Sequence, residues 1–133
     1  MSSRRRALIG AATAAAVVAG GLVLAAPAEA KGSRATIVRG DCSGATNWKL
    51  KAKPDDGLLE VEFEVDSNRV GQRWSWKIRH DGAVKASGVR TTLAPSGSFS
   101  VERRIVDAPG AHRIKATATN LRTGEVCRAT LTL

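Results

Sequence analysis

The sequence lacks tyrosine altogether, and among its 133 residues it has only two phenylalanines, two histidines and two cysteines. His80 and His112 are the only histidines, and neither shows the sequence signature of a partner for a serine or cysteine nucleophile. No catalytic, metal or cofactor constellation is recognisable, so we expect no enzyme activity and no cofactor. We expect His80 to be a solvated turn residue and His112 to be a corner residue with a hydrogen-bonded ring.

The first thirty residues have the composition of an export signal. Three arginines at 4–6 form a positive n-region, residues 7–26 are alanine-rich and apolar, and Ala28-Glu29-Ala30 fits the small-x-small rule for cleavage. We therefore expect cleavage after Ala30 and secretion. The alternative is an uncleaved anchor, because the apolar stretch is long for a signal peptide. The arginine-rich start leaves both the general and the twin-arginine export routes open.

The 103 residues that follow are enough for one domain with a small core. We expect residues 31–41 to form an N-terminal arm or edge strand and residues 42–133 to form the domain. Cys42 and Cys127 lie near the two ends of this part, and export into an oxidising compartment predicts that they form one disulfide. A crosslink closing so long a loop stabilises a fold by about 4 to 5 kcal/mol in the chain-entropy description.

Apolar and polar residues alternate with a period of two along most of the domain, which predicts strands. Residues 72–82 form the segment with the greatest apolar volume, and we expect a central strand that buries Trp74, Trp76 and Ile78 and ends in an Asp81-Gly82 turn. A weaker strand, broken at Gly88, should follow as its hairpin partner.

Two further segments, residues 47–53 and 59–65, predict neighbouring antiparallel strands joined by a four-residue turn at residues 54–57. Their outward side chains should pair across the strands, with Lys49, Lys51 and Lys53 facing Glu60, Glu62 and Glu64. The three glutamates could also bind calcium, but a strand spreads them along a flat face without a loop to wrap an ion.

Arg103 breaks the pattern of its own segment. Phe99, Val101 and Ile105 share one phase, which turns Arg103 inward unless a bulge near Glu102 intervenes. We expect that bulge or an edge position.

At least seven such segments, separated by turn signals about every ten residues and without a helical period, predict an all-β, two-sheet antiparallel β-sandwich of about seven strands. The Trp74 and Trp76 segment and residues 109–116 resemble strands C and F of immunoglobulin-like and fibronectin type III-like domains, which implies an immunoglobulin-like sandwich. His112 stands where those families usually carry a tyrosine, and Cys127 lies in the last strand, so the disulfide is not the bridge of that family. The chain from 42–44 to 123–127 also resembles small secreted actinobacterial proteins of unassigned activity, a resemblance that implies no catalytic residues.

The domain is strongly basic, because removal of the leader leaves 18 basic and 11 acidic residues, a charge of about +7. In the immunoglobulin-like arrangement the tryptophan strand and the last two strands share one sheet, and none of their outward residues is acidic. The opposite sheet should be near neutral. The candidate polyanion-binding residues on the basic face are Arg73, Lys77, Arg79, Arg113, Lys115 and Arg128.

From these features we expect a monomeric, secreted, non-enzymatic binding or structural module of the cell surface, with an unknown protein or an anionic polymer as partner. One alternative is a cationic module that binds an anionic cell-wall polymer, such as teichoic acid, or nucleic acid without sequence specificity. Another is a small-molecule carrier of the neocarzinostatin type, and a third is a solvated basic face without a partner. The inward tryptophans offer no stacking platform for bases, and membrane contact would come only from an uncleaved signal segment.

Overall fold

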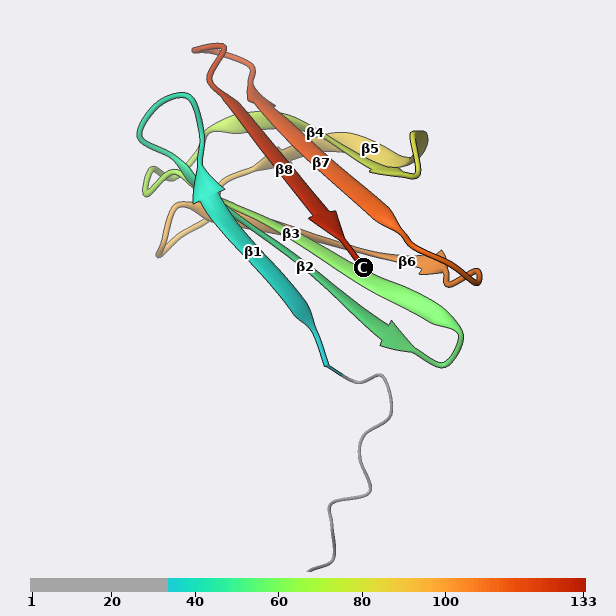
Figure 1. Cartoon of the computed structure of the whole chain (residues 1–133). Coiled ribbons are helices and arrows are strands. Elements are labelled where there is room, and N and C mark those ends of the chain that lie inside the picture. Colours follow the sequence, from blue (N-terminus) through green and yellow to red (C-terminus); the bar gives the residue numbers. More distant parts are fainter. Residues whose placement is uncertain (1–33) are drawn as a thin grey trace, which may run out of the picture.

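The structure, a computed structural model, describes residues 34–133 and shows two four-stranded antiparallel sheets packed face to face (Figure 1). The expected signal segment and its cleavage site lie outside these residues. The first sheet has the order β1-β2-β3-β6, and its strands are β1 (Thr36–Asp41), β2 (Asn47–Asp55), β3 (Leu58–Asp66) and β6 (Ser98–Val106). The second sheet has the order β5-β4-β7-β8, and its strands are β4 (Arg73–His80), β5 (Ala83–Thr91), β7 (Arg113–Asn120) and β8 (Val126–Thr132).

The predicted two-sheet β-sandwich is thus confirmed, with eight strands instead of about seven. The additional strand is β1, which pairs with β2 at the edge of the first sheet. No helix long and apolar enough to cross a membrane occurs among residues 34–133.

The chain changes sheets three times. The β2–β3 hairpin lies in the first sheet, the β4–β5 hairpin lies in the second, β6 returns beside β3, and β7 and β8 complete the second sheet beside β4. Strands β1 and β8 meet along one edge of the sandwich, and β5 and β6 meet along the other. The inner strands β4 and β7 are therefore covered on one face by the first sheet and exposed to solvent on the other.

The core lies between the sheets and is built from alternate residues of every strand except the exposed edge strand β5 and, in part, β1. As predicted, β4 is an inner strand, and Trp74, Trp76 and Ile78 are buried. Trp74 and Phe63 are the two largest of the fully buried side chains. Gly88 does not interrupt β5, and the indole of Trp76 packs on it so closely that an added Cβ would lie 3.2 Å from the ring.

The register between β2 and β3 is the predicted one. Lys49, Lys51 and Lys53 stand opposite Glu64, Glu62 and Glu60. The Nζ of Lys49 lies 3.5 Å from a carboxylate oxygen of Glu62 and 3.9 Å from one of Glu64. The turn is shorter than expected, because β2 continues through Asp55 and only Asp56 and Gly57 join the strands, with φ of 49° and 75°. Two successive residues at positive φ fit the right-handed twist of a two-residue hairpin.

Arg103 faces inward, and β6 shows no bulge. The expectation of an edge position was right, since β6 is the outermost strand of its sheet. The guanidinium carbon lies 5.0 Å from the ring centroid of Trp76, a cation–π contact, and Nη1 donates to the backbone carbonyl of Glu102 at 2.6 Å. An inward arginine is tolerated here because the open edge allows its charged head a polar partner.

The prediction for His80 was wrong. Its side chain is buried instead of solvated, because its ring lies beside that of His112 with the centroids 4.9 Å apart. His112 is buried as well and has the expected hydrogen bond, with His80 as the partner.

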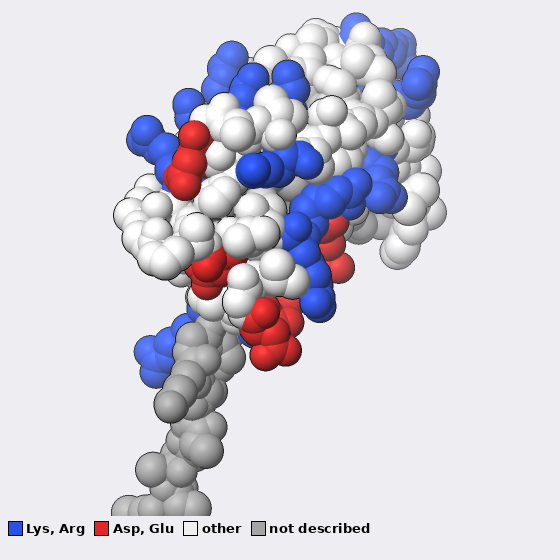
Figure 2. All heavy atoms as spheres, turned by 90° about the vertical axis from the view of Figure 1, so that its right-hand side faces the viewer, with Lys and Arg blue, Asp and Glu red and all other residues white. Residues whose placement is uncertain are grey.

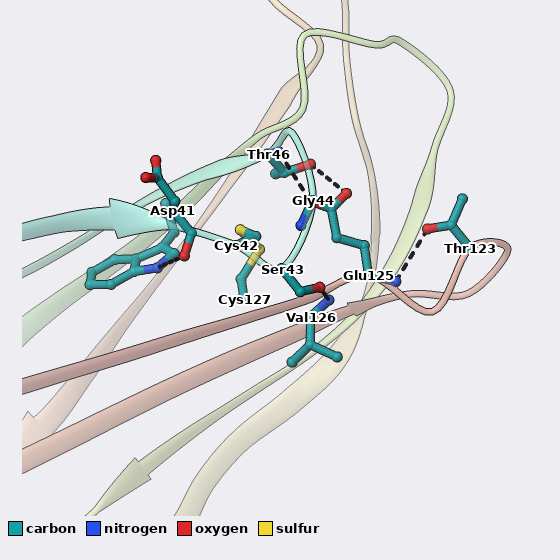
Figure 3. The surroundings of a disulfide bond; sticks show 10 residues. Asp41, Cys42, Ser43, Gly44, Thr46, Thr123, Glu125, Val126 and Cys127 are labelled. Carbon is teal, nitrogen blue, oxygen red and sulfur yellow. Dashed lines mark hydrogen bonds between the residues drawn. A yellow bond between two sulfur atoms is a disulfide. The ribbon is translucent and has the colours of Figure 1, made fainter.

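Cys42 and Cys127 form the predicted disulfide, with a Cα–Cα distance of 4.2 Å (Figure 3). Cys42 directly follows β1 of the first sheet, whereas Cys127 lies in β8 of the second. The bond therefore joins the two sheets at the edge where β1 and β8 meet.

The loop after Cys42 is held by the side chain of Glu125 in the β7–β8 hairpin (Figure 3). One carboxylate oxygen accepts the backbone N–H groups of Gly44 and Thr46 at 2.9 and 3.0 Å, and the other accepts the hydroxyl of Thr46 at 2.8 Å. A Cβ on residue 44 would lie 2.7 Å from that carboxylate, so the close approach requires glycine. Disulfide and carboxylate thus hold the same loop against the second sheet.

Replacing both cysteines (C42A/C127A) should lower the free energy of unfolding by about 4 kcal/mol, because the crosslink spans 85 residues of sequence. For a domain of this size the melting temperature should then fall by roughly 15 °C or more. Urea unfolding monitored by tryptophan fluorescence measures the change. A loss below about 1 kcal/mol would contradict the assigned role of the bond.

Candidate anion-binding face

The two sheets differ sharply in charge. The strands of the second sheet contain eight basic residues and no acidic one. The eight are Arg73, Lys77, Arg79, Lys85, Arg90, Arg113, Lys115 and Arg128. The strands of the first sheet contain six basic residues, Arg39, Lys49, Lys51, Lys53, Arg103 and Arg104, and seven acidic ones, Asp41, Asp55, Glu60, Glu62, Glu64, Asp66 and Glu102.

All six basic residues predicted for the face belong to the outward set of the second sheet, because their strand neighbours are buried in the core. We call this surface of β4, β7 and β8 the basic face. Lys77, Thr117 and Arg128 form one row across it, and Arg79, Lys115 and Thr130 form the next. Arg73 and Arg113 stand at opposite ends. On the side shown in Figure 2, basic side chains are scattered over the upper part of the molecule, and most of the visible acidic ones lie lower down.

Hydroxyl groups fill most of the positions between the cations. Thr117, Thr119, Thr130 and Thr132 all point outward from β7 and β8. Hydroxyls can donate to phosphate or carboxylate oxygens, and backbone spacing places neighbouring outward side chains about 7 Å apart along a strand and about 5 Å apart across strands. The face is thus a regular array of cations and hydroxyl donors.

Carboxylates occur only at the margins of this array. Asp81 lies in the β4–β5 turn, where its Oδ1 accepts the backbone N–H of Arg113 at 2.8 Å. Glu125 lies in the β7–β8 hairpin and is engaged by the loop after Cys42. Neither side chain lies within the rows of cations.

Arg79 and Lys115 stand directly opposite each other on the paired strands β4 and β7. Like charges in this position destabilise a sheet by a few tenths of a kcal/mol to about 1 kcal/mol. Residues 34–133 supply no ion pair to either side chain. Departures of this kind from local rules are expected where a surface serves binding.

One end of the basic face continues into a hollow of about 680 Å³. Arg69 contributes from the loop before β4, Arg73 from the start of β4 and Arg122 from the turn after β7. Val70 and Leu121 give the hollow an apolar part. The N–H of Leu121 donates to the carbonyl of Arg73 at 3.0 Å, which holds the two segments together. Three arginines from segments about fifty residues apart thus meet around one opening.

Sequence reasoning missed Arg69 and Arg122, because only the pairing of β4 with β7 brings their loops together. Lys85 and Arg90 of β5 do not belong to the basic face. Arg90 stands opposite buried Trp74, and Lys85 lines a hollow together with Arg104 and Ile105.

The substitution K115E should stabilise the protein by a few tenths of a kcal/mol to about 1 kcal/mol, because a carboxylate opposite Arg79 replaces a repulsive pair by an attractive one. The matched control is K51E, which changes the net charge equally but places a second carboxylate opposite Glu62 and should destabilise. Urea unfolding at low and high salt measures both effects, and salt should reduce them. A loss of stability with K115E as large as that with K51E would show that the pair is not repulsive.

Comparison with protein-family models, with curated proteins and with solved structures finds no match for this chain. A function for the protein must therefore be argued from its own charges and contacts.

Proposed function

We propose that this protein is a secreted, non-enzymatic module that binds an anionic polymer through the basic face. The observation that carries the proposal is the segregation of charge, with six outward basic residues and no acidic residue in strands β4, β7 and β8. Each lysine of β2 stands opposite a glutamate of β3, and Lys49 forms ion pairs with two of them. Among the described residues, Lys77, Lys115 and Arg128 of the second sheet have no acidic neighbour of this kind.

Such an array suits a repeating phosphate or carboxylate polymer. Each cation that neutralises an anionic group releases a condensed counterion, so affinity should fall steeply with salt and depend little on sequence. The outward threonines add hydrogen-bond donors, while the burial of Trp74 and Trp76 leaves no aromatic platform for stacked bases on this face. The partner favoured by this chemistry is a cell-wall polyphosphate of the teichoic acid type, with nucleic acid as a nonspecific competitor.

The proposed setting is the cell exterior. The disulfide is consistent with an oxidising compartment, and the predicted signal segment, with cleavage after Ala30, would deliver the chain there.

We also propose that the sandwich is immunoglobulin-like, in the manner of fibronectin type III domains. In those domains strands C and F are neighbours in one sheet, and β4 and β7, which carry the resemblance, are neighbours here. A relation to small secreted actinobacterial proteins is part of the same proposal.

The carrier alternative has less support in residues 34–133. The interior between the sheets is filled by side chains, including fully buried Trp74, Phe63 and Leu50, and the hollows lie at the surface. The hollow of about 680 Å³ is lined by arginines in addition to Val70 and Leu121. That lining suits an anionic group better than a wholly apolar ligand.

The test compares two triple variants that each remove three positive charges. K77Q/R79Q/R113Q removes them from the basic face, and K49Q/K51Q/K53Q removes them from the first sheet. Binding to fluorescently labelled polyphosphate is measured by anisotropy at several salt concentrations. The first variant should reduce the slope of log affinity against log salt by about 2, because each lost contact reduces it by roughly 0.7 to 0.9. The second should leave the slope close to that of the wild type.

Equal losses in the two variants would show that binding follows net charge alone and would contradict the proposal. Absence of binding by the wild type at low salt would overturn it as well. Thermal unfolding of both variants serves as the control that each remains folded.

A further inference from the structure

The end of the sandwich opposite the disulfide carries a cluster of buried nitrogen atoms that the basic face does not use. His80 is the last residue of β4, and His112 directly precedes β7. Their side chains are 10% and 6% exposed. The Nε2 of His80 lies 2.7 Å from the Nδ1 of His112, so the two ring nitrogens point at each other.

Two carboxylates complete the cluster. Oδ2 of Asp81 lies 3.4 Å from the Nε2 of His80, while Oδ1 of the same side chain accepts the backbone N–H of Arg113 at 2.8 Å. The hydrogen bond from Arg113 fixes the carboxylate with its other oxygen toward the histidine. Oδ1 of Asp107 lies 2.9 Å from the other nitrogen of His112, Nε2. The two atoms do not meet the geometry of a hydrogen bond, but the negative charge beside Nε2 still favours the tautomer that carries its proton there, which leaves the lone pair of Nδ1 on the side of His80.

From this arrangement we infer a binding site for one divalent transition-metal ion, with Nε2 of His80, Nδ1 of His112 and a carboxylate oxygen of Asp81 as its ligands. One ligand atom from each of these residues lies within 4.8 Å of the others, and they are the only such group of three among residues 34–133. Two imidazoles and one carboxylate form a set that Zn²⁺ accepts, with the fourth tetrahedral position open to water. Asp107 would act behind His112 as the outer carboxylate that commonly orients a ligating imidazole.

The two rings must move to hold an ion. Two nitrogens that bind one tetrahedral Zn²⁺ at about 2.0 to 2.1 Å are roughly 3.3 Å apart, so the rings must separate by about half an ångström from their present 2.7 Å contact and rotate until both lone pairs converge on one point. A surface hollow of about 400 Å³, lined by His80, Ile105 and Val106, gives access from solvent. Lys85 and Arg104 also line it, and their charge opposes that of a cation, whereas Asp81 and Asp107 favour it.

The composition of the chain means that any binding of a transition metal can be assigned to this site. His80 and His112 are the only histidines in the sequence, and both cysteines are consumed by the disulfide. No second imidazole or thiolate can therefore account for transition-metal binding. The two aspartates of Asp-Gly turns provide a matched pair, because Asp56 has a φ of 49° and Asp81 a φ of 47°, but only Asp81 lies beside the histidines.

The experiment is calorimetric titration of the chelator-treated protein, with the disulfide intact, with zinc sulfate. We expect one ion per chain, a higher melting temperature in the presence of zinc because the ion binds only the folded state, and perturbation of both imidazoles in NMR spectra. H112Q should abolish binding, and D81N should weaken it about tenfold or more. D56N should bind as the wild type does.

Absence of heat and of imidazole perturbation at millimolar zinc would overturn the site and leave the pair as a structural hydrogen bond. Equal affinity in D81N and D56N would remove Asp81 from the ligand set. If H112Q proves unfolded, the imidazole spectra of the wild type with and without zinc decide the question. None of these measurements involves a polyanion, so they test the metal site independently of the proposed binding of an anionic polymer.

Discussion

The rest of the molecule depends on the burial of alternate side chains between two sheets. Once Trp74 and Trp76 of β4 are committed to the core, the period of the strand directs Arg73, Ser75, Lys77 and Arg79 to solvent. The same constraint acts on β7 and β8, whose inward residues are mostly small or aliphatic and whose outward ones are cations and threonines. A slip of one residue in any of these strands would bury charge, so the packing of the core also fixes the array on the outer surface.

The two sheets treat their outward charges differently, although both bury the same core. In the first sheet, lysines and glutamates alternate across β2 and β3, and their attraction supports the register. In the second sheet the outward cations face threonines or each other, as Arg79 and Lys115 do. The fold thus gains no ion pair from the basic face, and this is the reason for proposing a role in binding a partner. The disulfide and the Glu125 contacts hold the β1 and β8 edge closed and leave that face uncovered.

Local periodicity was sufficient to predict the fold class, the burial of the β4 tryptophans and the β2–β3 register, because each depends on alternation within a strand or on a short turn. The disulfide was predicted on a different ground, from the presence of just two cysteines in a chain with an export signal. Local periodicity could not predict contacts between residues that are far apart in the sequence and are brought together only by the pairing of distant strands. Arg103 lies over Trp76 because β6 ends up at an edge beside β5, and His80 is buried because β7 brings His112 against it. The arginine-lined hollow depends likewise on the pairing of β4 with β7.

The central claim is that the outer surface of the second sheet, and not the net charge of the chain, binds an anionic polymer. Amide chemical-shift mapping during titration with polyphosphate tests it most directly, because the response is resolved by residue. The account predicts that the largest shifts fall on the outward positions of β4, β7 and β8, around Lys77, Lys115 and Arg128, and that β2 and β3 change little. Shifts spread evenly over the lysines of both sheets, or concentrated on β2, would contradict it.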